Sequence, residues 1–156
     1  MTDPTLFTAR LAMLLYAAAL ACLLLRRRAR LLYTAGAVVF VLHVVAAFHF
    51  RHHWSHAEAL ENVRLQTLAL TDVRSGAGLW LNYLFSAVWA IDVCWWWMAG
   101  DNRYRARRQW ITMAVHGFLL FMAINATIVF PGGATRIAGI TALVTLLILA
   151  VLRKRR

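Results

Sequence analysis

Four histidines lie within eight positions of this chain, in the stretch HFRHHWSHAE. They are His49, His52, His53 and His56. Neutral imidazoles bind zinc, copper and iron, and intervals of three and four residues bring helical side chains to one side. Glu58 could fold back toward the same ion. The stretch therefore predicts a transition-metal site for metal handling or redox chemistry. The alternative is a set of polar aromatic residues at a lipid headgroup boundary, beside Arg51 and Trp54.

A second candidate site consists of polar residues within apolar stretches. Asp92 is the only acid there, and Asn82, Ser86 and Trp89 recur at helical spacing before it, so this stripe should face the interior of a helix bundle. By the rise of a helix, His116 comes to a similar depth as Asp92. We expect the two to meet, either as a buried hydrogen bond that fixes helix rotation or as a site that binds a proton or an ion. The third alternative is exposure of both residues to a water-filled crevice.

Two further polar residues, His43 and Asn125, lie nearer the other end of their apolar stretches. A haem b held by His43 and His116 would need both ligands at one depth, whereas the helical rise separates them by roughly 10 Å. Haem is therefore the less favoured cofactor.

The elements that must position these residues are transmembrane helices. The chain has 156 residues, of which 62% are hydrophobic, whereas a soluble domain is about 45–50% apolar. A membrane-spanning helix needs about 20 mostly apolar residues. Five stretches qualify, at about 7–25, 31–50, 79–99, 110–130 and 137–152, of which the last is the shortest. We predict a single domain, an all-α bundle of five transmembrane helices in a lipid bilayer.

Charge predicts the orientation of this bundle. Twelve of the 17 basic residues form three clusters, which follow the first and third spans and end the chain. Five spans place all three clusters on one face, which the positive-inside rule makes cytoplasmic. The N-terminus is then outside and the C-terminus inside. Arginine outnumbers lysine 16 to 1, a composition that points to a bacterial inner membrane. Lipid phosphate accounts for the net charge of +11 without nucleic acid as a partner.

The one long connection, residues 51–78, lies on the outer side in this topology. Ser55 and Glu58 have the spacing of a capping box, which predicts a short surface helix over about 55–70.

Three functions follow from these features. The first is metal binding at the outer histidines. The second is a non-catalytic subunit or assembly factor, in which the small residues Gly36, Ala123 and Gly139 pack a partner membrane protein or a second copy. The third is a proton- or ion-coupled carrier that uses Asp92 and His116.

Overall fold

The computed structural model describes residues 3–154. Within this range the chain is helical and contains no strand. In chain order the helices are α1 (Pro4–Leu24), α2 (Arg30–Phe50), α3 (His56–Thr71), α4 (Ala77–Arg105), α5 (Gln109–Ile124), the π-helical segment η1 (Asn125–Val129) and α6 (Gly133–Lys154).

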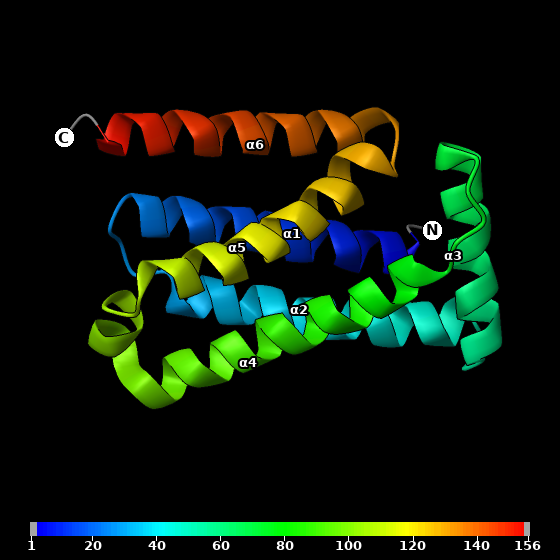
Figure 1. Ribbon diagram of the computed structural model, residues 1–156, viewed down its shortest axis with the longest axis horizontal. Helices are drawn as coiled ribbons and strands as arrows, with labels where there is room; N and C mark the ends of the chain where they lie inside the picture. The colour runs from blue at the N-terminus through cyan, green and yellow to red at the C-terminus, as the bar shows by residue number, and fades with distance from the viewer. Residues whose placement is uncertain (1–2, 155–156) are drawn as a thin grey trace.

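Five helices in residues 3–154 are long and apolar enough to cross a membrane: α1, α2, α4, α5 continued by η1, and α6. These five run along the long axis of the molecule, and α3 crosses one end of them (Figure 1). The prediction of five membrane-spanning helices is thus confirmed by length and composition. The last of them is longer than expected, because α6 is helical over 22 residues.

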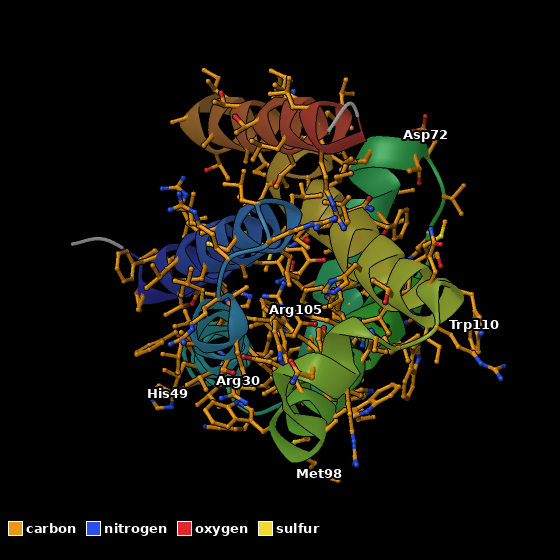
Figure 2. The ribbon with its side chains drawn as sticks, turned by 90° about the vertical axis from the view of Figure 1, so that its left-hand side faces the viewer. Arg30, His49, Asp72, Met98, Arg105 and Trp110 are labelled. Carbon is orange, nitrogen blue, oxygen red and sulfur yellow. The ribbon has the colours of Figure 1, made fainter. Side chains whose placement is uncertain are left out.

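The two ends of the bundle differ in charge. One end carries the α1–α2 connection, the α4–α5 connection and the C-terminal end of α6 (Figure 1). These segments hold the first two basic clusters and Arg153 of the third. We call this the basic end, and Figure 2 looks toward it, with Arg30 and Arg105 near the viewer. The opposite end carries α3 and is called the α3 end.

The core of the bundle is aromatic. Its largest fully buried side chains are Trp89, Trp96, Tyr16, Tyr33 and Leu119. The Trp89 ring meets the Tyr16 ring edge to face, with centroids 5.2 Å apart, a favourable geometry for aromatic pairs. Gly36 on α2 makes room for Trp89, since a Cβ at Gly36 would lie 2.8 Å from the indole ring.

A kink at Gly100 changes the direction of α4 near the basic end. Its φ of 78° and ψ of 166° interrupt the helix, and only glycine adopts this backbone conformation readily. After the kink the chain doubles back, and the Tyr104 ring stacks on Trp96 with centroids 3.9 Å apart and planes 2° from parallel. The tyrosine is thereby turned toward the interior of the bundle, where it is 3% exposed.

Helix α3 begins at the predicted cap. The Ser55 hydroxyl accepts a hydrogen bond from the Glu58 backbone amide at 3.2 Å. The Glu58 carboxylate does not complete the capping box, because its Oε2 lies 3.1 Å from His53 Nδ1 instead. The observed helix, His56–Thr71, agrees closely with the expected range of 55–70.

Two arginines fix the connection between α3 and α4 through Glu61. Arg74 donates to the Glu61 carboxylate at 2.5 Å and Arg64 lies 3.6 Å from it. The hydrogen bond from Arg74, followed by the other contacts of the two arginines, lowers the pKa of Glu61 below its ordinary value of 4.5. A lowered pKa adds stability above the unfolded-state pKa, and this stability disappears as the pH falls through the folded-state value.

We therefore expect Arg74→Ala to raise the pKa of Glu61 toward its ordinary value. A carbon-13 NMR titration of the Glu61 carboxyl group in micelles would measure the change. Arg136→Ala is the matched control, because Arg136 donates to backbone carbonyls instead of a carboxylate. An unchanged Glu61 pKa in Arg74→Ala would show that the ion pair does not form.

Candidate functional site

The buried Asp92 carboxylate is the centre of a hydrogen-bonded cluster. Its Oδ2 accepts from the Tyr33 hydroxyl at 2.9 Å and from the Tyr104 hydroxyl at 2.7 Å. Its Oδ1 accepts from Nη1 of Arg107, and the side chains of both ion-pair partners are only 2% exposed. Together with His116, these four residues are called the carboxylate centre.

Three separate segments bring the partners to Asp92. Tyr33 lies in the first turn of α2, Tyr104 follows the kink in α4, and Arg107 lies in the α4–α5 connection. Arg107 is fixed by two more hydrogen bonds, from Nε to the Thr112 hydroxyl at 3.0 Å and from Nη2 to the Tyr104 hydroxyl at 3.1 Å. A buried ion pair is tolerated when its remaining polar atoms are bonded in this way.

His116 joins the centre through Tyr104. Its Nε2 lies 3.4 Å from the Tyr104 hydroxyl oxygen, and the proton of that hydroxyl already points to Asp92. Nε2 must then carry hydrogen and donate, which leaves Nδ1 as a bare acceptor. Nδ1 is indeed buried without a hydrogen-bond partner. The expected proximity of Asp92 and His116 is therefore indirect, with Tyr104 between them.

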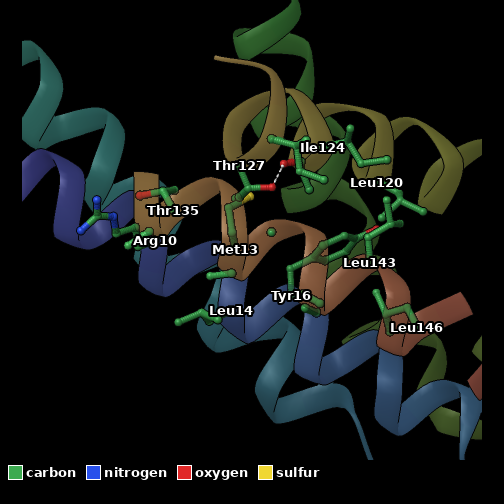
Figure 3. Close-up of a pocket in the computed structure, with 17 residues that line it drawn as sticks. Arg10, Met13, Leu14, Tyr16, Leu120, Ile124, Thr127, Thr135, Leu143 and Leu146 are labelled. Atoms are coloured by element: carbon green, nitrogen blue, oxygen red, sulfur yellow. Dashed lines mark hydrogen bonds between the residues drawn. The ribbon is translucent and has the colours of Figure 1, made fainter. Parts of the chain in front are cut away.

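A groove beside α6 reaches the carboxylate centre. A pocket of about 630 Å³ lies among α1, α5 and α6 near the basic end, and Tyr104, Arg107 and His116 line it. A second pocket of about 220 Å³ continues toward the α3 end (Figure 3). The two share the side chains of Leu120, Leu143 and Leu146 in their walls. We call the pair of pockets the α6 groove.

The polar stripe expected on α4 differs from the observed one. Asn82 is exposed, and its carbonyl accepts from the Ser86 hydroxyl at 2.9 Å. Trp89 and Asp92 of the expected stripe are buried, and the buried face of α4 also carries Phe85 and Trp96. Large aromatic side chains bury more apolar area than a short amide side chain, so they determine which face turns inward.

The other two intramembrane polar residues bond to backbone carbonyls. His43 Nδ1 lies 2.9 Å from the Thr5 carbonyl oxygen in the first turn of α1. Asn125 donates to the Phe121 carbonyl at 2.8 Å, where α5 passes into the π-helical segment. His43 is thus engaged near the α3 end, whereas His116 belongs to the carboxylate centre. Haem remains the less favoured alternative.

The turn between α2 and α3 separates the rings of the histidine cluster. His53 and Trp54 have φ values of 47° and 60° and reverse the chain. His49 is exposed on the last turn of α2, with its ring against Trp54 at 6.3 Å between centroids. His52 Nδ1 is buried without a partner. Desolvation lowers the pKa of His52, which favours the neutral form that binds metals.

The remaining two histidines bond to other side chains. His53 Nδ1 lies 3.1 Å from Glu58, and His56 Nδ1 lies 3.0 Å from the Tyr83 hydroxyl of α4. In the described part of the chain, no group of three or more His, Cys, Asp or Glu side chains is placed to hold one metal ion. The metal site at His49, His52, His53 and His56 stays a prediction, which metal analysis of the purified protein would test.

The small residues expected to pack a partner are used within the chain. Gly36 lies against Trp89, and a Cβ at Gly139 of α6 would come within 2.7 Å of the Thr127 hydroxyl. Ala123 is 8% exposed in the core. These three positions therefore pack helices within the bundle, and packing against a partner membrane protein or a second copy stays a prediction.

Sequence reasoning identified Asp92 and His116 but not Tyr33, Tyr104 or Arg107. The two tyrosines could have been considered as hydrogen-bond partners of Asp92, because a buried tyrosine hydroxyl usually finds a hydrogen-bond partner. Arg107 carried no such signal, since it is one of four arginines in the stretch RYRARR. Which of these arginines pairs with Asp92 depends on the kink at Gly100, and the run of basic residues does not predict this kink.

Comparisons of the chain with protein-family models, with curated proteins and with solved structures find no match. A function is therefore inferred from the carboxylate centre and the α6 groove.

Proposed function

We propose that this chain is a small proton-coupled membrane carrier and that the carboxylate centre is its coupling site. The observation that supports this function is a chain of hydrogen-bonding groups from the α6 groove to a buried carboxylate. His116 lines the groove, its Nε2 lies 3.4 Å from the Tyr104 hydroxyl, and this hydroxyl bonds Asp92 at 2.7 Å. Ionisable residues inside a membrane commonly form such proton relays.

Protonation of Asp92 can change helix packing, because its hydrogen-bond partners come from different segments of the chain. Asp92 is bound from α2 by Tyr33 and from the α4–α5 connection by Arg107. A proton that reaches the carboxylate weakens the pairing with Arg107, and a buried charge without its partner is unfavourable. Protonation then shifts the equilibrium between two arrangements of these segments, and a substrate in the groove that prefers one arrangement is coupled to the proton.

The proposal includes the orientation of the bundle in the membrane. The basic end faces the cytoplasm of a bacterial inner membrane, with the N-terminus outside and the C-terminus inside. The support is that the α1–α2 connection, the α4–α5 connection and the end of α6 with Arg153 lie at the same end of the bundle (Figure 1), as the positive-inside rule requires. The carboxylate centre then lies nearer the cytoplasmic side, and the histidine cluster lies outside.

Proton exchange at the centre can be measured by infrared difference spectroscopy of the protein in liposomes, between about pH 3 and pH 8, a range that includes the ordinary pKa values of carboxyl and imidazole groups. We expect imidazole and carboxyl bands that change together. His116→Phe should remove the imidazole band and alter the carboxyl band.

The matched control is His43→Phe, because His43 is the other intramembrane histidine and lies outside the centre. It should leave the coupled bands unchanged. If the wild-type spectrum holds no band that His116→Phe removes, the centre does not exchange protons and the proposal fails.

A further inference from the structure

The walls of the α6 groove are mostly apolar, and the groove widens toward the basic end. Near the α3 end α6 packs closely on η1, with Gly139 against Thr127. Toward the basic end the volume grows from about 220 Å³ to about 630 Å³, and the walls include Leu20, Leu143 and Leu147. The wide part has the dimensions of a small-molecule site and suits a flexible hydrocarbon chain.

Three arginines lie at the wide end. All three line the pocket: Arg26 from the α1–α2 connection, Arg105 from the end of α4 and Arg153 from the end of α6. None of the ion pairs in residues 3–154 includes them. Figure 2 shows Arg105 at this end of the molecule.

The acids near this end already have partners. Asp92 is paired with Arg107, and Asp101 lies 3.9 Å from Arg30 and accepts from the Trp96 indole at 2.7 Å. The wide end of the groove therefore presents positive charge that no carboxylate of the described chain neutralises. Arginine binds phosphate through two parallel hydrogen bonds, so a phosphate group fits this end by both charge and geometry.

We propose that the α6 groove binds one anionic phospholipid of the surrounding bilayer. Its acyl portion lies along the leucine-lined walls, and its phosphate lies between Arg26, Arg105 and Arg153. This inference rests on the proposed function, because it names the substrate class of the same carrier. The headgroup then lies beside His116 and Tyr104, which line the same pocket, so the occupied groove is next to the proton relay.

Native mass spectrometry of the purified protein would test lipid binding, with phosphatidylglycerol and phosphatidylcholine of identical acyl chains as probes. We expect one tightly bound phosphatidylglycerol and at least a tenfold preference over phosphatidylcholine, about the effect of one charge-assisted contact. The triple variant Arg26→Gln, Arg105→Gln, Arg153→Gln should reduce the preference to less than twofold.

One charge control and a pair of glycine variants separate the groove from general surface charge. Arg28→Gln combined with Arg103→Gln removes basic residues of the same end that do not line the groove, and should keep the preference. Gly117→Leu adds a side chain to the groove wall, where a Cβ meets nothing within 4 Å, and should displace the lipid. Gly132→Leu, which also meets nothing within 4 Å but lies outside the groove, should not.

Equal retention of both lipids, or equal loss in the groove and control variants, would overturn the inference. Competition by inorganic phosphate without any effect of Gly117→Leu would also overturn it, because the acyl chain would then make no contact. The infrared bands of His116 are measured separately. If they persist while lipid selectivity is absent, the lipid inference fails and the proton-coupled function stands.

Discussion

Asp92→Asn should lower the free energy of unfolding by about 3–5 kcal/mol, the typical cost of removing one partner from a buried ion pair. The reason is that Arg107, with a side chain only 2% exposed, would keep its charge without a carboxylate beside it. Reversible unfolding of the protein in mixed detergent micelles would measure the loss.

The double variant Asp92→Asn with Arg107→Gln should recover much of this loss, because no charge remains buried. Asp72→Asn is the matched control, since Asp72 is exposed and its left-handed conformation, φ 56°, suits asparagine. Additive losses from Asp92→Asn and Arg107→Gln would show that the two side chains do not pair.

A second double-mutant cycle, between Asp92 and His116, distinguishes direct contact with Asp92 from indirect contact. Coupling between Asp92 and Arg107 should exceed coupling between Asp92 and His116, because Tyr104 lies between the latter two. Residues that share a hydrogen-bond network without touching couple more weakly than residues in contact.

Gly100→Ala should destabilise the protein by about 1–3 kcal/mol, the cost of a non-glycine residue in a conformation that glycine almost alone adopts. A Cβ at Gly100 meets nothing within 4 Å, so the backbone conformation at φ 78° and ψ 166° is the sole cause. Relief of this strain would straighten α4 and move Tyr104 away from Asp92. The loss should therefore appear both in unfolding and in the infrared carboxyl band.

Gly117→Ala is the control for this substitution. Gly117 lies within α5, and a Cβ there also meets nothing within 4 Å. Because alanine favours a helix over glycine by about 1 kcal/mol, this change should be neutral or stabilising. Equal effects of Gly100→Ala and Gly117→Ala would contradict the kink as the element that positions Tyr104.

The sequence was sufficient for the number of long helices and for the short helix after Ser55. These features depend on composition over about 20 residues and on a local cap, both of which are readable along the chain. The helical rise also predicted that Asp92 and His116 come to one level of the bundle, and both contact the Tyr104 hydroxyl. The sequence could not predict that Arg107 pairs with Asp92, because the chain reversal at Gly100 determines which of several arginines faces inward.

The histidine cluster shows how residue spacing loses its meaning across the end of a helix. Spacing at three and four residues predicts a common face only while the helix continues. Here α2 ends at Phe50, and the reversal at His53 and Trp54 interrupts the helical spacing before His56, so the metal site stays a prediction. Short polar motifs at helix boundaries therefore carry less geometric information than the same residues within one helix.

The composition of the carboxylate centre bears on how the protein is made. All of its members, from Tyr33 to His116, precede α6 in the chain, so each can reach its partner before the last helix leaves the ribosome. The final helix then inserts beside a bundle whose ion pair is already formed, and it covers the side on which Tyr104, Arg107 and His116 line the groove. Membrane biogenesis of this protein can thus proceed in two steps, in which the ion pair closes first and the groove wall is added last.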